Sequence, residues 1–343
     1  MTARHGVALI GLGMAVTPHA KSLRDLSDRV EVRAAMSRSQ ARQQSFAKTF
    51  DFPVTGDFET IIDDPAIDIV LLLTPPNARC EFVQRLAEKG KHILMEKPVE
   101  RTTEAAVELV DICEQAGVQL GIVFQHRFRE ASMKLAQMLA AGDLGDLAVI
   151  NLHVPWWRPQ SYYNEPGRGS LARDGGGVLI SQAIHSMDLL ISLVGLPSEV
   201  TAFAGTTKLH QMETEDFVGA GWRFANGAVG AFSATTAAFP GQPETIEIVG
   251  TKAAACIQSG ALTITQLDGG QEVFGETQIG GGGADPMAFP HDWHKNVITD
   301  FLDAVDENRA PGIPGREALK VHRLIDALLQ SSTAGRAVQV EKD

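Results

Sequence analysis

Apolar runs and helix-like segments alternate along the first 124 residues of the chain. The segment Thr103–Gln115 has the clearest helix signals, with hydroxyls at Thr102 and Thr103 to cap its start and Gly117 beyond its end. Strands that alternate with helices are typical of βαβ units, so this part predicts a doubly wound, parallel sheet. The apolar runs are Val7–Ile10, Val30–Met36, Ile67–Leu73, His92–Met95 and Val118–Phe124.

The pattern changes after about residue 125, where longer runs alternate between apolar and polar positions. Two of them, Asp216–Phe224 and Ala228–Thr236, are joined at Asn226–Gly227, which is a strong hairpin signal. This half therefore predicts a largely antiparallel sheet. Helices are predicted at about 130–141, 178–194, 293–308 and 316–331, and Gly280–Gly283 predicts a flexible loop.

These patterns predict an α/β protein of two domains. Residues 1–125 form the doubly wound parallel sheet, and residues 126–343 form an α/β domain with a large, mostly antiparallel, open sheet. We expect a substrate cleft between the domains, with the helix at about 316–331 packing back near their interface. Helices on one face of the open sheet leave its other face to be covered, so we expect a homodimer or homotetramer through the second domain.

Composition narrows the class of protein. The 343 residues are 44% hydrophobic and 21% charged, as in an ordinary globular protein, and 30 basic against 42 acidic side chains leave a net charge of -12. That charge disfavours nucleic acid and anionic membranes as partners, and no run approaches the length of a transmembrane span. Three scattered cysteines without C-x-x-C spacing fit a reduced, cytoplasmic setting.

The stretch Gly6–His19, GVALIGLGMAVTPH, is an apolar strand that leads through a glycine turn into a predicted helix. Gly11 allows the tight turn, and Gly13, which has no Cβ, lets backbone N–H groups approach a pyrophosphate at the positive end of the helix. Val16 replaces the third glycine of the G-x-G-x-x-G motif. The motif alone therefore fits a plain turn as well as a dinucleotide site.

Lys97 is the first catalytic candidate. The run His92–Pro98 places it at the end of a buried strand, on the edge where doubly wound sheets bind ligands. Close to a nicotinamide ring and away from water, its pKa should fall, which would let the amine exchange a proton. The alternative is a lysine that extends from a strand end into solvent.

The second candidate lies on the predicted helix that follows Gly175–Gly177. Ser181, His185 and Asp188 align beside an apolar stripe, and such short, mostly uncharged side chains are unlike an ordinary solvated helix face. We therefore predict a face that lines a cleft, on which His185 exchanges protons and Asp188 orients it. A histidine that merely lies near the surface is the alternative.

A third region, residues 155–173, has little regular pattern, and loops of this length are often functional. It contains both tyrosines of the chain and two of its four tryptophans. We predict that this loop grips a small polar ligand, and a subunit contact is the competing interpretation. The predicted substrate-binding residues are Trp157, Arg158, Tyr163, Arg168, Ser181 and Asp188.

No metal site is predicted. His291 and His294 lie three residues apart, but neither an H-E-x-x-H motif nor clustered cysteines accompany them. We interpret both histidines as residues at the start of a helix.

The motifs GLGMAVTPH, TPPN, MEKP and GGGxLxxxxxHxxD occur in this order. With them the chain resembles, over nearly its whole length, the glucose-fructose oxidoreductase, inositol dehydrogenase and rhizopine-catabolism family, Gfo/Idh/MocA. The resemblance implies a Rossmann domain followed by an α/β domain, and hydride transfer between nicotinamide and a secondary carbinol or carbonyl of a sugar or polyol. The predicted cofactor-binding residues are Gly11, Gly13, Met14, Ala15, Ser37, Arg38, Thr74, Pro75, Asn77, Glu96, Lys97 and Gln125.

Two departures from common patterns bear on the chemistry. His185 falls on the family's catalytic histidine, but Ser181 stands where members commonly carry an aspartate, so we assign proton transfer to Lys97 and His185 and leave open which is the base. After the second strand the chain has Ser37 and Arg38, where NAD-binding proteins usually offer a carboxylate to the ribose. Both side chains could bond a 2′-phosphate, so NADP is favoured and NAD is the alternative.

The sequence thus predicts an NADP-preferring dehydrogenase or reductase of a sugar, cyclitol or related carbohydrate. One alternative is a glycosidase that retains NAD and oxidises its sugar transiently. A second is a non-catalytic sensor that binds the cofactor to report redox state.

Overall fold

The computed structural model describes residues 4–276 and 290–341, which fall into two compact units. The first unit comprises residues 4–125 and 290–319, and the second comprises 126–276 and 320–341. The sequence pattern predicts one domain for all residues after 125, and the structure differs by grouping 290–319 with the first unit. The reason is apolar packing, because helix α9 (Asp292–Asp306) buries Val297 and Phe301 and contacts α1 (Val16–Asp25).

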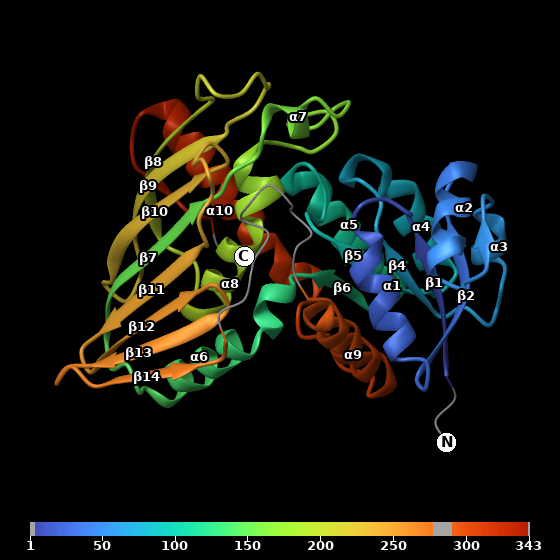
Figure 1. Ribbon diagram of the computed structural model, residues 1–343, viewed down its shortest axis with the longest axis horizontal. Coiled ribbons are helices and arrows are strands. Elements are labelled where there is room, and N and C mark those ends of the chain that lie inside the picture. Colours follow the sequence, from blue (N-terminus) through green and yellow to red (C-terminus); the bar gives the residue numbers. More distant parts are fainter. Residues whose placement is uncertain (1–3, 277–289, 342–343) are drawn as a thin grey trace. The chain divides into compact units, whose positions relative to one another are not determined.

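The first unit is built on a six-stranded parallel sheet with the strand order β3-β2-β1-β4-β5-β6 (Figure 1). The order reverses between β1 and β4, and ligands of doubly wound sheets bind beside such a switch point, beyond the carboxyl ends of the strands. The strands are β1 (His5–Ile10), β2 (Val30–Met36), β3 (Val54–Thr55), β4 (Ile69–Leu72), β5 (His92–Glu96) and β6 (Leu120–Val123).

Helices pack around this sheet in pairs, α1 with α9 and α4 with α5. Helix α5 (Thr103–Ala116) has the predicted ends, since the Thr102 hydroxyl accepts a hydrogen bond from the Ala105 N–H at 3.3 Å and Gly117 follows with a φ of 69°. The other helices of this part are α2 (Gln40–Thr49), α3 (Glu59–Ile62), the short 3-10 helix η1 (Pro76–Ala78) and α4 (Cys80–Glu88).

The second unit contains a nine-stranded sheet with the order β14-β13-β12-β11-β7-β10-β9-β8-β15. Adjacent strands pair antiparallel except for β7 and β10, and the β9–β10 pair is the predicted hairpin. The strands are β7 (Leu147–Pro155), β8 (Glu199–Gly205), β9 (Phe217–Arg223), β10 (Val229–Thr235), β11 (Thr245–Gly250), β12 (Ala253–Gln258), β13 (Ala261–Gln266), β14 (Gln271–Phe274) and β15 (Val338–Gln339).

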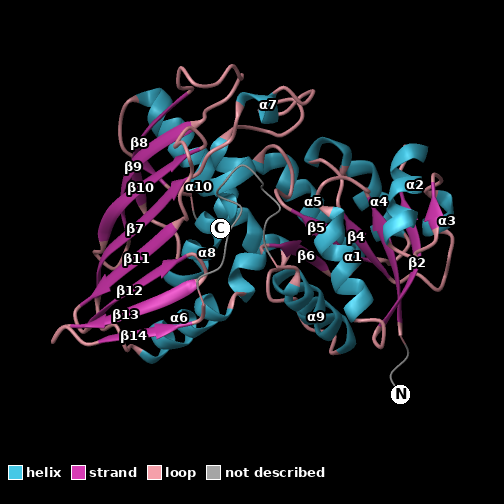
Figure 2. Ribbon diagram, viewed as in Figure 1, coloured by secondary structure: helices cyan, strands magenta, loops and turns pink. Residues whose placement is uncertain are grey.

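Helices lie on one face of this nine-stranded sheet (Figure 2). The predicted fold class, a parallel sheet followed by a mostly antiparallel open one, is confirmed, and Gly280–Gly283 lie outside the described residues. Among the helices of residues 4–276 and 290–341, none has the length and apolar character that a membrane crossing requires. The helices are η2 (Gln125–Phe128), α6 (Glu130–Ala141), α7 (Gln160–Tyr163), the π-helical η3 (Leu179–Ala183), α8 (Ile184–Val194) and α10 (Gly315–Ala334).

Candidate functional site

The glycine turn between β1 and α1 is shaped for the close approach of a ligand. Gly11 has a φ of 107°, and a Cβ there would lie 2.9 Å from the carbonyl carbon of Leu73, so a larger residue would be strained. At Gly13 no atom of the described residues lies within 4 Å of the Cβ position. Ala15, at the N-cap of α1, provides no side-chain hydrogen bond to the first N–H groups of the helix. These donors therefore remain suited to an anion.

The other residues predicted to bind cofactor follow the carboxyl ends of four parallel strands, which share one edge of the sheet. Ser37 follows β2, Thr74 follows β4, Lys97 follows β5 and Gln125 follows β6. The Thr74 Oγ1 and Gln125 Oε1 atoms are buried and have no hydrogen-bond partner within the described part of the chain. Buried polar atoms of native proteins are nearly always paired, so both atoms are candidates for a ligand.

Arg38 is exposed just after β2, and its guanidinium carbon lies 5.9 Å from the centre of the Phe82 ring. The Ser37 hydroxyl accepts a hydrogen bond from the Ser39 N–H at 3.2 Å, while Gln43 donates to the Ser37 carbonyl at 2.6 Å. The turn is therefore held by its own backbone and side chains. The Arg38 guanidinium reaches solvent at the end of the sheet.

The backbone N–H of Lys97 contacts a buried pair formed by Glu96 and His19. One Glu96 carboxylate oxygen accepts a hydrogen bond from the Lys97 N–H at 3.2 Å, and the other bonds to His19 Nε2 at 2.8 Å. The His294 ring packs edge-on against the His19 ring at 4.9 Å, and donor atoms of His19, Glu96 and His294 lie within 4.8 Å of one another. The sequence pattern predicts no functional role for His19, and it predicts His294 only as a residue at a helix start.

The Glu96 carboxylate is ionised at neutral pH. Burial raises the pKa of Glu96, but the hydrogen bond from His19 and the nearby basic side chains outweigh burial and lower it to about 2. Burial lowers the pKa of His294 to about 3, so that imidazole is neutral. A fixed negative charge therefore lies one residue before Lys97.

The Glu96 pKa predicts how stability depends on pH. Because the folded pKa of Glu96 lies below the unfolded value of about 4.3, the ionised carboxylate stabilises the fold above that value. This stabilisation is lost as pH falls toward 2. We expect Glu96→Gln to lose less stability than the wild type between pH 6 and pH 3, measured by urea unfolding at each pH. The exposed Glu88→Gln serves as control, and wild-type acid sensitivity in Glu96→Gln would contradict the assignment.

In the second unit, the helix that carries His185 is anchored at its start by Glu215. The Glu215 carboxylate accepts hydrogen bonds from the N–H groups of Gly177 and Leu179 at 3.2 and 3.1 Å, and the Glu215 carbonyl accepts from Val178 at 2.8 Å. A Cβ at Gly177 would lie 1.8 Å from that carbonyl oxygen. Glycine at position 177 therefore lets the turn pack against Glu215 before η3 begins.

The predicted polar face of this helix divides into two parts. Ser181 and His185 are partly exposed, and the Ser181 hydroxyl donates to the Gly177 carbonyl at 2.5 Å. Asp188, predicted to orient His185 and to contact substrate, is only 1% exposed, and both its oxygens accept hydrogen bonds from Arg127 at 2.7 and 2.6 Å. The buried pair with Arg127 holds the Asp188 carboxylate, and the predicted contacts of Asp188 with His185 and with substrate stay predictions.

A second histidine lies against His185. The rings of His126 and His185 are stacked with their centres 4.9 Å apart and their planes 26° apart. Arg129 bonds to His126 Nε2 and pairs with Glu244 at 2.8 Å. Arg129 thereby joins the His126 ring to the buried Glu244 carboxylate. His185 thus has an aromatic neighbour held by a buried ion pair.

The aromatic loop is held mainly by contacts within the second unit. Arg158, a predicted substrate ligand, is 1% exposed and donates to the Trp157 carbonyl at 2.7 Å and to Gln182 Oε1 at 3.2 Å. Tyr163 is also buried, and its hydroxyl bonds to Thr236 at 2.6 Å. These contacts assign both side chains to the support of the loop.

Other side chains of the loop retain exposed area. Trp157 is partly exposed and packs edge-on against Phe239, with ring centres 5.3 Å apart. Arg168 lies over the Tyr162 ring at 4.8 Å and pairs with Glu165 at 2.8 Å. Trp157 and Arg168 therefore remain the loop residues suited to contact substrate.

Two models of one protein family match the chain. The first, an oxidoreductase family with an NAD-binding Rossmann fold, matches residues 5–124, and the second, the GFO/IDH/MocA C-terminal domain, matches residues 132–256. The chain belongs to the GFO/IDH/MocA oxidoreductase family. The resemblance found in the sequence is thereby confirmed.

Several similar proteins match the chain nearly end to end. YrbE of Bacillus subtilis, an uncharacterized oxidoreductase, is 23% identical over an alignment of 356 positions, which spans 99% of this chain and 98% of YrbE. D-xylose 1-dehydrogenase (NADP(+)) 2 of Haloferax volcanii is 23% identical over 317 residues, or 91% of this chain and 92% of that protein. Levoglucosan dehydrogenase in complex with NADH and levoglucosan is 24% identical, with a TM-score of 0.86 over 99% of this chain and 100% of its own. The last comparison establishes a shared fold.

The family implies an NAD(P) cofactor, and the first unit fits one. The open space at Gly13, the uncapped start of α1 and the unpaired buried oxygens of Thr74 and Gln125 lie where a doubly wound sheet binds a dinucleotide. The chain is an NAD(P)-dependent oxidoreductase.

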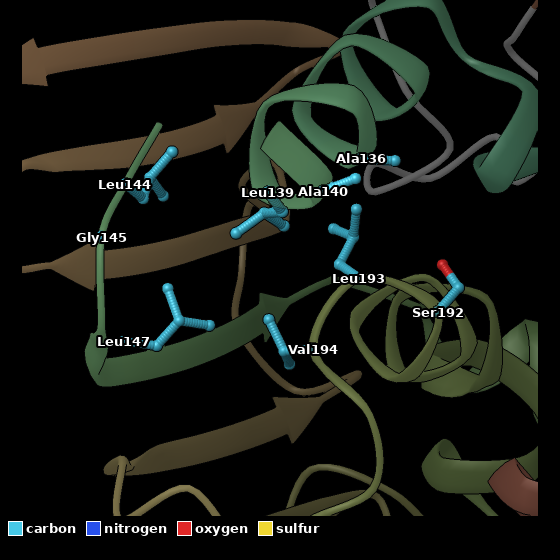
Figure 3. Close-up of a pocket in the computed structure, with 9 residues that line it drawn as sticks. All are labelled: Ala136, Leu139, Ala140, Leu144, Gly145, Leu147, Ser192, Leu193 and Val194. Atoms are coloured by element: carbon cyan, nitrogen blue, oxygen red, sulfur yellow. The ribbon is translucent and has the colours of Figure 1, made fainter. Parts of the chain in front are cut away.

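A cavity of about 380 Å³ lies elsewhere, in the second unit, beside α6 and the end of α8 (Figure 3). The side chains that line it are apolar apart from that of Ser192, whose hydroxyl donates to the Leu189 carbonyl at 2.7 Å. No residue predicted to bind cofactor or substrate lines this cavity, so it is not assigned to the reaction. The lining residues are Ala136, Leu139, Ala140, Leu144, Gly145, Leu147, Ser192, Leu193 and Val194.

Proposed function

We propose that this chain is an NADP-preferring dehydrogenase or reductase of a sugar, cyclitol or related carbohydrate. The observation that carries the proposal is the sheet edge of the first unit, where the glycine turn, two unpaired buried oxygens and Lys97 follow the carboxyl ends of parallel strands. The names of the relatives support carbohydrate as the substrate class, because one is a D-xylose dehydrogenase and another is a levoglucosan dehydrogenase.

Lys97 and His185 are the groups proposed to move the proton that accompanies hydride transfer. When bound, the nicotinamide accepts or supplies the hydride. The Lys97 ammonium or amine exchanges a proton with the substrate oxygen, and the ionised Glu96 holds the Lys97 backbone through its N–H. The partly exposed His185 ring, stacked on His126, is the second proton-exchanging group. Trp157, Arg168 and Ser181 are the side chains proposed to contact the substrate.

NADP preference rests on the residues that follow β2. An acidic side chain at this place bonds the ribose hydroxyls of NAD, whereas Ser37 and the exposed Arg38 offer donors to a 2′-phosphate. Arg38→Glu is expected to raise the Michaelis constant for NADPH far more than that for NADH. Lys48→Glu makes the same charge change at an exposed position of α2 and serves as control. Equal effects of Arg38→Glu on both cofactors would refute the preference.

The substrate class is tested by supplying the enzyme with a panel of sugars, cyclitols and sugar acids and following the absorbance of reduced nicotinamide. The proposal expects reduction of the cofactor by at least one carbohydrate, faster with NADP⁺ than with NAD⁺. Hydrolysis of glycosides without net reduction would instead favour the cofactor-retaining glycosidase.

We also propose that the chain forms a homodimer or homotetramer through the face of the nine-stranded sheet that the helices leave uncovered. Exposed apolar side chains on this sheet support the proposal, among them Phe203 on β8 and Val273 on β14. Sedimentation equilibrium measures the oligomeric state directly.

A further inference from the structure

Arg79 is a buried cation whose hydrogen bonds, within the described residues, all go to backbone oxygens. It is the N-cap residue of α4, and its side chain is 1% exposed. Its guanidinium donates to the Thr74 carbonyl through Nε at 3.0 Å and through Nη2 at 2.8 Å, to the Val99 carbonyl at 3.3 Å, and to the Pro98 carbonyl.

These contacts join the ends of two neighbouring strands. Thr74 lies just beyond β4, in the segment proposed to flank the dinucleotide, while Pro98 and Val99 directly follow the proposed catalytic Lys97. A planar guanidinium with several fixed N–H directions can bridge such carbonyls, which a single ammonium cannot do equally well. Arg79 therefore fixes the backbone after Lys97 relative to the backbone at Thr74.

The Lys97 peptide is thus held from both sides by buried side chains. The Glu96 carboxylate accepts a hydrogen bond from the Lys97 N–H, and Arg79 donates hydrogen bonds to the carbonyls of Pro98 and Val99. Among the described residues, no carboxylate forms an ion pair with Arg79, and Glu96 and Glu100 act on it only at longer range. Burial lowers the pKa of Arg79 to about 10, so the guanidinium still carries its charge at neutral pH.

A cation buried without an ionic partner is costly, and packing with an apolar side chain of similar size would be cheaper for stability alone. We propose that Arg79 is a positioning residue for the reaction, which holds Lys97 and the Thr74 segment in one fixed arrangement. This inference rests on the proposed function of Lys97. Arg79 itself has no exposed surface with which to contact substrate.

The same strand offers a matched control at its other end. Lys91 precedes β5, is 4% exposed, and donates to the carbonyls of Asp64 and Ile67 at 2.9 and 2.7 Å. It is likewise a buried cation held by backbone oxygens, but it lies at the amino end of the strand, away from Lys97. Lys91→Met therefore removes a similar set of contacts with no expected effect on the reaction.

The experiment compares Arg79→Met, Arg79→Lys and Lys91→Met with the wild type at a temperature where all are folded. We expect both Arg79 variants to lower kcat by about 10- to 100-fold, as small misplacements of a catalytic group do. Amide hydrogen exchange should accelerate at Lys97 and Val99, and Lys91→Met should change neither quantity. If Arg79→Met does not fold, Arg79→Lys, which keeps the charge, still tests whether the several N–H directions of the guanidinium are required.

Three outcomes would overturn the inference: a kcat within twofold of the wild type in a folded Arg79 variant, unchanged exchange at Lys97 and Val99, or an equal loss of kcat in Lys91→Met. Hydrogen exchange and fluorescence titration with NADPH need no turnover, so they test Arg79 even if no carbohydrate is oxidised. Normal turnover in Lys97→Met would instead remove the proposed function of Lys97 while leaving the exchange result to stand by itself.

Discussion

Lys97→Met is expected to lower turnover by about two to four orders of magnitude, the usual contribution of a general acid or base. The change removes the amine but keeps most of the length of the unbranched side chain. The backbone N–H that bonds to Glu96 is also retained, so the turn after β5 should keep its shape. Steady-state kinetics with the best carbohydrate of the panel measures the loss, and fluorescence titration with NADPH should show nearly unchanged affinity.

Lys89→Met is the control for this prediction, because Lys89 is exposed at the end of α4 and takes no part in the proposed reaction. Turnover in Lys97→Met close to that of the control would remove Lys97 from the mechanism. A large loss of NADPH affinity would show that Lys97 acts in cofactor binding.

Arg127→Met is expected to destabilise the protein by about 3–5 kcal/mol, the range found when one partner of a buried ion pair is removed. The Arg127 side chain is 13% exposed and that of Asp188 is 2% exposed, and two short hydrogen bonds join them. Loss of the guanidinium leaves the carboxylate buried without its bidentate partner. Urea unfolding followed by circular dichroism gives the change in free energy.

The double variant Arg127→Met/Asp188→Leu separates the ion pair from the loss of packing. Because it removes both charges, it should recover most of the stability that the single variant loses. A single variant with an unchanged unfolding midpoint, or a double variant no more stable than the single one, would contradict this account of the pair.

Most of the fold could be predicted because its signals are local. The helix at Thr103–Gln115 has its cap and its terminal glycine within the sequence, and the Asn226–Gly227 hairpin joins two strands that pair directly. The grouping of residues 290–319 was not predicted, because α9 belongs to the first unit through contacts with α1 that are distant in sequence. The two-residue strand β3 is too short to give any pattern.

The candidate site was predicted in outline, but not the residues that support it. Motif residues such as Gly13 and Lys97 lie at strand ends, a position that the sequence pattern reveals. Arg79 contacts the carbonyls of Pro98 and Val99 on the next strand end, His126 stacks on the ring of His185, and no spacing marks these contacts in advance. Arg158 is of a residue type that often binds ligands, and only its burial assigns it to the support of the loop.

Transfer of deuterium tests the central claim most directly. The enzyme is given NADP⁺ and a carbohydrate deuterated at the carbon that is oxidised, and both products are analysed by mass spectrometry. The account predicts reduced cofactor with deuterium at nicotinamide C4, in an amount equal to the carbonyl product. Hydrolysed glycoside with no net reduced cofactor, or bound cofactor with no carbohydrate converted across the panel, would contradict it.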